Sequence, residues 1–309
     1  MTPVETTEIR PGYTISRVLK GGWQLAGGHA PVDRQKAVAE MGDYLRSGIT
    51  TFDCADIYTG VEQLIGDFRR ATIAAGDGEL LAPLKVHTKC VPDLQKLRTL
   101  TKPELQATID RSLARLGLEQ LNLVQFHWWD IGVPRYVEVA GWLADFQKAG
   151  KIDLLGATNF NTTCVREIGD AGVDLASLQV QYSLLDDRPQ KALLGLCAER
   201  GIKILCYGTV AGGFLSDRWL GVPEPQGELE NRSLTKYKLI IDDIGGWDLF
   251  QELLDDPRIG GAIPVFGGEC GLPQEDPPPA ARLAHYHYNA APNASAAVFL
   301  RRLENWLVE

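Results

Sequence analysis

The sequence predicts an α/β protein of the (β/α)8, or TIM-barrel, class, folded as a single domain over its 309 residues. Two observations support this. Short runs of β-branched and apolar residues alternate with stretches of helical periodicity, and eight such strand-like runs can be found. A third observation excludes the main competitor: no Gly-x-Gly-x-x-Gly pattern follows the first run, whereas an open doubly wound sheet usually carries one and has fewer strands. A closed barrel is therefore favoured.

Each predicted strand is a short run of apolar or β-branched residues. The runs are residues 15–23, 50–56, 84–89, 121–127, 153–160, 178–184, 203–209 and 260–267. Amphipathic segments predict connecting helices at 33–48, 61–72, 102–117, 135–150 and 190–201. The first helix illustrates the pattern, since Ala37, Met41, Tyr44 and Leu45 recur at helical spacing after the capping residue Asp33.

The C-terminal part of the chain departs from this regular pattern. Residues 270–296 contain Pro273, Pro277, Pro278, Pro279 and Pro292, and prolines at this density forbid a continuous helix where a regular barrel places its last one. A short amphipathic helix is predicted at about 295–308. We therefore expect residues 251–309 to form a divergent last strand and an irregular Pro-rich tail.

Composition disfavours several classes of function. The 40 acidic residues outnumber the 31 basic ones and give a net charge of -9, which disfavours binding to nucleic acid or to an anionic membrane surface. No signal peptide and no membrane-spanning run is evident. The six cysteines form no Cys-x-x-Cys pair, so we expect reduced thiols, no metal site and a cytoplasmic protein.

Polar residues stand at the carboxyl ends of three predicted strands. Asp53 ends the second strand and Tyr58 follows in its loop, Lys89 ends the third strand, and His127 ends the fourth. Active sites of (β/α)8 barrels lie at this end of the strands. We therefore expect these four side chains to converge on one site.

The chemistry of the four side chains suits proton donation. A phenol alone has a pKa of about 10, but a nearby lysine ammonium favours its ionised form, and a histidine can hydrogen-bond the same oxygen. Tyr58 is therefore expected to donate a proton near neutral pH, with Lys89 and His127 as its tuners and Asp53 as the partner of Lys89. Such a site protonates an oxygen that becomes an alkoxide as a hydride reaches the attached carbon.

Six segments resemble the aldo-keto reductase family in the same order along the chain. They are FDCADIYTGVEQLIG, VHTKC, LVQFHWWD, LLGATNFN, VQYSLLD and YGTVAGGFL, and the resemblance covers roughly residues 15–250. It implies carbonyl reduction by NADPH on a barrel. It also implies that the family's catalytic tetrad corresponds to Asp53, Tyr58, Lys89 and His127.

The resemblance further implies a cofactor groove and a substrate pocket. Asn159, with Thr158, and Gln181 are expected to hold the nicotinamide carboxamide, because amides both donate and accept hydrogen bonds. Tyr207 is expected to stack on the nicotinamide ring, and two small residues let the backbone approach a pyrophosphate, namely Gly212 and Gly213. An aromatic substrate pocket is expected from Trp23, Trp128 and Trp129.

One departure from the family pattern bears on the cofactor. The turn VFGGECGLPQED holds no lysine or arginine for the 2′-phosphate of NADPH, and Glu269, Glu275 and Asp276 repel it. NADPH is the expected cofactor, with NADH as the alternative. Candidate sources of the missing positive charge are Arg218 and Arg232, in the segment after the seventh predicted strand, and Arg282 in the tail.

Two other functions compete with the reductase. A non-catalytic cofactor-binding regulatory module, similar to the channel β subunits of the same family, is supported by the altered tail. A barrel aldolase would use Lys89 as a Schiff-base lysine, although the surrounding aspartate, tyrosine and histidine suit hydride chemistry better. The expected partner is a small-molecule carbonyl compound or alcohol, whose identity the sequence does not specify.

Overall fold

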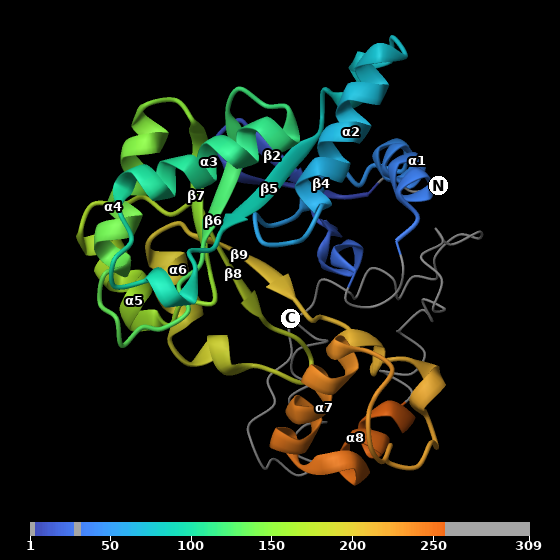
Figure 1. Ribbon diagram of the computed structural model, residues 1–309. Coiled ribbons are helices and arrows are strands. Elements are labelled where there is room, and N and C mark those ends of the chain that lie inside the picture. The colour runs from blue at the N-terminus through green and yellow to red at the C-terminus, as the bar shows by residue number, and fades with distance from the viewer. Residues whose placement is uncertain (1–3, 28–31, 257–309) are drawn as a thin grey trace. The chain divides into compact units, whose positions relative to one another are not determined.

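The computed structural model describes residues 4–27 and 32–256. Seven strands form one sheet in chain order from β3 to β9, and each neighbouring pair from β3 to β8 is parallel (Figure 1). The strands of this sheet are β3 Lys20–Gly21, β4 Thr51–Asp53, β5 Lys85–Cys90, β6 Leu121–Phe126, β7 Ile152–Thr158, β8 Ser177–Gln181 and β9 Lys203–Tyr207. This is the strand order of the (β/α)8 class.

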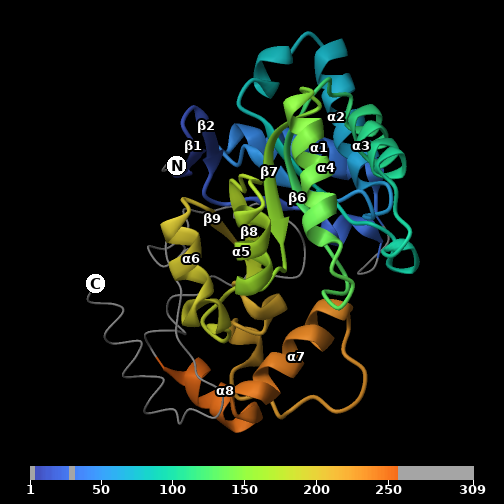
Figure 2. The same ribbon diagram turned by 90° about the vertical axis from the view of Figure 1, so that its left-hand side faces the viewer.

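Helices alternate with the strands along the chain. They are α1 Arg34–Arg46, α2 Val61–Ala74, α3 Lys102–Leu116, α4 Tyr136–Lys148, α5 Thr162–Asp170, α6 Leu193–Glu199, α7 Arg232–Ile244 and α8 Gly246–Asp255. Helices α1 to α4 lie next to one another in chain order around the outside of β4 to β7 (Figures 1 and 2). Asp33 caps α1 as expected, since its carboxylate accepts hydrogen bonds from the backbone N–H groups of Gln35 and Lys36.

Most of the predicted elements are confirmed within the described ranges. The first predicted strand, 15–23, is the main exception, because only β3 joins the parallel sheet there and Trp23 begins a short 3-10 helix. Helices α5, α7 and α8 were not among the predicted ones. The predicted strand at 260–267 and helix at 295–308 lie outside the described residues.

An N-terminal hairpin was also not predicted. Strand β1 Thr6–Arg10 pairs antiparallel with β2 Tyr13–Ser16, and the turn between them uses Gly12 at a φ of 77°, a backbone conformation that glycine adopts without steric cost. One face of the hairpin is apolar and packs in a buried cluster with residues of the sheet region. The cluster comprises Ile9, Tyr13, Ile15, Leu123, Ala176 and Leu205.

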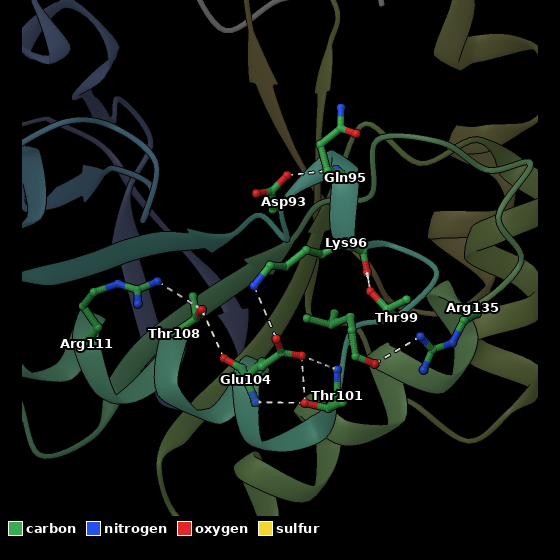
Figure 3. A network of polar contacts seen from close by, with 10 residues as sticks. Asp93, Gln95, Lys96, Thr99, Thr101, Glu104, Thr108, Arg111 and Arg135 are labelled. Atoms are coloured by element: carbon green, nitrogen blue, oxygen red, sulfur yellow. Dashed lines mark hydrogen bonds and ion pairs between the residues drawn. The ribbon is translucent and has the colours of Figure 1, made fainter.

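A polar network fixes the start of α3. Thr101 and Glu104 form a capping box, in which the Thr101 hydroxyl accepts from the Glu104 N–H and the Glu104 carboxylate accepts from the Thr101 N–H at 2.9 Å (Figure 3). Lys96 reaches the same carboxylate at 3.4 Å. One turn later Arg111 donates to the hydroxyl of Thr108 at 3.1 Å. The beginning of this helix is therefore held by side chains as well as by its backbone.

The other end of α3 lies against α2. A Cβ added at Gly66 of α2 would stand 1.9 Å from the carbonyl oxygen of Arg115, so only glycine permits this approach of the two backbones. Arg69 of α2 also donates to the carbonyl oxygen of Leu116 at 3.1 Å. These contacts set the position of Arg115 relative to α2.

The chain divides into two compact units. Of the described residues, one unit contains 4–27, 32–179 and 195–205, and the other contains 180–194 and 206–256. The second unit has its own apolar core, built largely by α7 and α8 around the aromatic residues Phe214, Trp219, Trp247 and Phe250. No described helix is both long and apolar enough to cross a membrane.

Candidate active site

Asp53 and Lys89 form a buried ion pair at the ends of neighbouring strands. The Lys89 ammonium lies 2.5 Å from Oδ2 of Asp53 and donates to the Cys54 carbonyl oxygen at 3.0 Å. The Lys89 side chain is 7% exposed and the Asp53 side chain is 13% exposed. Burial disfavours the ammonium, but the charge of Asp53, the neighbouring Tyr58 and the hydrogen bond to Asp53 together outweigh burial, so the pKa of Lys89 lies above its usual value. Lys89 is therefore a protonated lysine at neutral pH.

Two glutamines complete the surroundings of Asp53. Gln125 of β6 and Gln179 of β8 both donate their side-chain N–H groups to Oδ1 of Asp53, at 2.7 and 2.9 Å. The carboxylate is thus held by side chains from three other strands of the sheet. Sequence analysis missed both glutamines, although each stands two residues before a predicted site residue on the same face of its strand.

Tyr58 lies in the turn that joins β4 to α2, close to Lys89. The Lys89 ammonium is 5.3 Å from the centre of the Tyr58 ring. Burial raises the pKa of Tyr58 above its usual value, and the opposing attraction of Lys89 does not fully offset it. The expectation that Lys89 lowers the pKa of Tyr58 below its usual value is therefore wrong in its direction, because desolvation of the phenol is the larger effect. Tyr58 is protonated at neutral pH and holds a proton that it can donate.

His127 follows β6, where its backbone N–H donates to the Cys90 carbonyl oxygen at 3.0 Å. Burial, and then the charge of Lys89, lower the pKa of His127, so the ring is neutral at neutral pH. Its Nδ1 atom is buried and has no hydrogen-bond partner among the described residues. The structure thus brings Asp53, Lys89 and Tyr58 into contact and places His127 within electrostatic reach of Lys89.

The three predicted pocket tryptophans differ in their surroundings. Trp23 packs its ring edge-on at 5.1 Å from that of Tyr58, and Trp129 packs at 4.6 Å from that of His127. They are 39% and 50% exposed, so each offers an apolar surface beside a candidate catalytic side chain. Trp128 is instead 5% exposed and donates to the Val133 carbonyl oxygen at 3.0 Å.

Thr158 and Asn159 stand at the carboxyl end of β7. Thr158 is buried. Asn159 has a φ of 60°, which is unusual for a residue other than glycine although asparagine tolerates it best. Its backbone N–H donates to the Gln179 carbonyl oxygen at 2.9 Å, and this bond holds the residue in the left-handed region. Strained backbone of this kind concentrates at functional sites.

The other predicted cofactor residues belong to the second compact unit. Gln181 donates to the buried carboxylate of Asp186 at 2.6 Å, and Arg188 binds the same carboxylate through two nitrogens at 2.7 and 2.6 Å. Arg188 is consequently a charged group that sequence analysis did not identify. The Lys236 ammonium lies 4.4 Å from the centre of the Tyr207 ring.

The glycine turn after β9 adopts left-handed backbone. Gly212 and Gly213 have φ values of 66° and 104°. A Cβ at Gly212 would come within 2.5 Å of the Tyr237 ring, whereas a Cβ at Gly213 would meet no atom within 4 Å. Gly212 is therefore needed for packing, and Gly213 leaves the backbone open to approach by a ligand.

Of the basic residues considered for the cofactor phosphate, Arg218 is paired with Glu230 and Arg232 begins α7. Arg282 and the acids Glu269, Glu275 and Asp276 lie outside the described residues. Across residues 4–27 and 32–256, no group of three or more side chains is arranged to hold a metal ion.

Comparison with known proteins gives a consistent family. The model of the aldo/keto reductase family matches residues 17–258. The NADH-specific methylglyoxal reductase of Escherichia coli is 28% identical over 236 residues, which cover 69% of this chain and 68% of that protein. The 6-dehydroglucose reductase of Novosphingobium aromaticivorans is 31% identical over 223 residues, covering 66% and 68%. Four other curated relatives are spanned by this chain over only 44 to 58% of their length.

Solved structures agree on the fold. The holo form of an aldo-keto reductase from Bacillus halodurans superimposes with a TM-score of 0.60 at 23% identity and covers 83% of this chain and 84% of that one. An aldo/keto reductase from Klebsiella pneumoniae, in complex with NADP and acetate, gives 0.57 at 22% identity over 71% and 74%.

These matches confirm the predicted (β/α)8 fold class. Both expected cofactors also occur among the relatives, as NADP in the Klebsiella structure and as NADH in the name of the Escherichia coli enzyme. Because the family model covers more than three quarters of the sequence, the chain belongs to the aldo/keto reductase family.

Proposed function

We propose that this protein is a nicotinamide-dependent oxidoreductase that reduces an aldehyde or ketone to an alcohol, or catalyses the reverse reaction, with Tyr58 as the general acid. One observation carries the proposal. Tyr58 lies with its ring centre 5.3 Å from the ammonium of Lys89, and that ammonium is paired at 2.5 Å with the buried carboxylate of Asp53. A neutral phenol beside a fixed positive charge is suited to giving up a proton during a reaction.

Each side chain has a separate part in this chemistry. Tyr58 donates its phenolic proton to the carbonyl oxygen of the substrate as negative charge develops there. The Lys89 ammonium stabilises the phenolate that remains, and Asp53 holds Lys89 in place with the help of Gln125 and Gln179. The neutral ring of His127 hydrogen-bonds and orients the substrate oxygen.

The cofactor, when bound, supplies the hydride that reaches the substrate carbon. The residues fit such a group. Asn159 is held in a left-handed conformation by Gln179, and Gly213 leaves space beside its backbone. In the proposed assignment Thr158, Asn159 and Gln181 would bind the carboxamide, Tyr207 would stack on the nicotinamide ring, and Gly212 and Gly213 would leave room for the pyrophosphate.

The substrate is a small-molecule carbonyl compound or alcohol. Trp23 and Trp129 are the proposed substrate-facing residues, because both are partly exposed beside Tyr58 and His127. Trp128 packs against the Phe126 ring and supports the pocket from the core. Four described cysteines, Cys54, Cys90, Cys164 and Cys197, are buried thiols, which is compatible with a reducing compartment, and we place the enzyme in the cytoplasm.

The two competing functions are less well supported. A Schiff-base aldolase needs a neutral amine, but the attraction of Asp53 holds the pKa of Lys89 above its usual value. A non-catalytic cofactor-binding module has no need for a buried ion pair beside a protonated tyrosine. The hydride-transfer function uses the protonated Lys89, its ion pair with Asp53 and the protonated Tyr58.

The direct test is turnover. Purified protein is mixed with NADPH or NADH and a panel of small aliphatic and aromatic aldehydes, and loss of absorbance of the reduced cofactor is followed. We expect turnover with at least one pair of cofactor and aldehyde. Cofactor binding, seen by fluorescence of the seven tryptophans, without any turnover in either direction would instead support the regulatory module.

A further inference from the structure

The turn that carries Tyr58 is tied to strand β5 by Asp56. The backbone N–H of Asp56 donates to the carbonyl oxygen of Lys89 at 3.2 Å, and Oδ1 of Asp56 accepts from the N–H of Val91 at 3.2 Å. Asp56 stands two residues before Tyr58, and its two contacts lie at and just after Lys89. The spacing between the phenol and the ammonium therefore depends on where Asp56 is held.

Asp56 is held from its other side by an arginine of α3. Arg115 donates to the carbonyl oxygen of Asp56 at 3.0 Å, and the same nitrogen lies 3.2 Å from the Glu62 carboxylate. Glu62 is 1% exposed, and its other oxygen accepts from the Thr88 hydroxyl at 2.7 Å. Glu62 thus fixes the guanidinium from α2 while the guanidinium fixes the turn.

The backbone of Arg115 has little freedom. The close approach of Gly66 holds α2 against the Arg115 carbonyl group. Helix α3 ends at Leu116, the residue after Arg115, and is followed by the C-cap residue Gly117 with a φ of 64°. An arginine anchored by its backbone, by a buried carboxylate and by the packing of two helices presents its donor in a fixed place.

We propose that Arg115, anchored by Glu62, is a positioning residue that sets the geometry of Tyr58 relative to Lys89 by holding the carbonyl group of Asp56. It touches neither Tyr58 nor Lys89 in the described contacts and acts through the turn. The inference rests on the proposed function of Tyr58 as proton donor. The positioning itself can be measured without turnover, so the two can fail independently.

The test compares Arg115→Met with Arg111→Met, which removes the same charge one turn earlier on α3. The Arg111 guanidinium donates to the Thr108 hydroxyl and its charge acts on the Asp56 carboxylate, so this control removes a charge near Asp56 while keeping the Arg115 hydrogen bond to the Asp56 carbonyl oxygen. Because Arg115→Met leaves Glu62 buried without its cation, a second variant, Arg115→Met with Glu62→Gln, removes both charges and keeps an acceptor for Thr88. A further pair of variants probes the hydrogen bond between the Asp56 carboxylate and the Val91 N–H. Asp56→Asn keeps an acceptor for this N–H, and Asp56→Ala does not.

Three quantities are measured on each folded variant: kcat with an accepted aldehyde, cofactor affinity by tryptophan fluorescence, and amide hydrogen exchange of the peptide covering residues 54–61. We expect the two Arg115 variants and Asp56→Ala to lose about tenfold or more in kcat, because small misplacements of a catalytic group are costly. Cofactor affinity is expected to stay within about threefold of the wild type. Exchange should accelerate in residues 54–61, while Arg111→Met and Asp56→Asn stay close to the wild type.

Unchanged exchange and unchanged kcat in the Arg115 variants would overturn the proposal. So would a loss of kcat that comes with equal loss of cofactor affinity and faster exchange throughout the chain, since that pattern indicates general destabilisation. If exchange accelerates only at residues 54–61 but the wild type has no turnover, the positioning role stands and the proposed reductase function is the one that fails.

Discussion

Asp53 and Lys89 are 36 residues apart in the sequence, yet their charged groups lie 2.5 Å apart between adjacent parallel strands. The strand register pairs Asp53 with His87. Lys89 stands two residues after His87 on β5, so its side chain projects from the same face of the sheet as that of Asp53. The carboxylate receives two further donors from Gln125 and Gln179. A buried pair with this many partners is expected to behave as one unit when either residue is changed.

Replacing Lys89 by methionine is expected to impair both stability and turnover. Removing one partner of a buried ion pair leaves an uncompensated charge and costs about 3–5 kcal/mol. The Tyr58 phenolate also loses its stabilising cation, so the pKa of Tyr58 rises further. Chemical denaturation and steady-state kinetics measure the two effects.

The double variant Asp53→Asn with Lys89→Met separates these effects. It should recover much of the free energy of unfolding, because no buried charge is left alone, but turnover should stay at the level of the single variant. Recovery of turnover together with stability would remove Lys89 from the chemistry.

Replacing Asn159 by glycine tests the cofactor assignment. Glycine adopts the φ of 60° without strain, so the free energy of unfolding should change by less than about 1 kcal/mol. If the Asn159 amide holds the carboxamide, cofactor affinity should fall about tenfold, equivalent to about 1.4 kcal/mol. Fluorescence titration gives the affinity, and unchanged binding would assign the carboxamide to other groups.

Stability should depend on pH through His87. Burial lowers the pKa of His87 to about 4, from its ordinary 6.5. Between these values the unfolded chain binds a proton at His87 that the folded protein does not, so the His87 contribution to the free energy of unfolding falls as the pH drops from about 6.5 to about 4, by up to about 1.4 kcal/mol per pH unit. The His87 contribution is fully present above about pH 6.5. Burial raises the pKa of Asp56 to about 7, so the Asp56 contribution changes in the opposite direction over the same range.

Urea denaturation at a series of pH values measures this dependence. His87→Gln cannot gain a proton in this range and leaves Asp56 and the other titrating groups in place, so its free energy of unfolding should fall less, or rise more, than that of the wild type between about pH 6.5 and about pH 4. The same pH dependence in His87→Gln as in the wild type would assign the acid sensitivity to other groups.

The preference between NADPH and NADH is expected to be small. The 2′-phosphate needs a nearby cation, but Arg218 is already paired with Glu230. We expect less than about tenfold preference for NADPH, worth under about 1.4 kcal/mol. Steady-state kinetics with both cofactors gives the ratio. A thousandfold preference would show that a basic residue occupies the phosphate site, and variants of Arg188, Arg232 and Arg282 would identify it.

The sequence predicted the parts of the site that follow from periodicity. Parallel strands end at one edge, so polar residues that end predicted strands, such as Asp53 and Lys89, could be expected to meet. The direction of the Tyr58 pKa could not be predicted, because it depends on how deeply the phenol is buried. The contact of Arg115 with Asp56 was also out of reach, since it depends on the packing of α2 against α3.

The overall fold also contains elements that the sequence predicted and elements that it did not. The regular strands β4 to β9 have clear apolar patterns, and their existence was predicted correctly. The antiparallel hairpin of β1 and β2 could not be predicted from the alternation of strands and helices, because its short strands lie outside that alternation. Helices α7 and α8 follow a long segment with little periodic signal, and their stability comes from an aromatic core formed only on folding.

The most direct test of the account is the rate of hydride transfer in Tyr58→Phe under single-turnover conditions with saturating reduced cofactor. The substitution removes one hydroxyl group and keeps the ring beside Trp23 and Lys89. We predict a loss of at least about a hundredfold in rate, the usual contribution of a general acid, with cofactor affinity nearly unchanged. Retention of most of the wild-type rate would contradict the assignment of Tyr58 as the proton donor.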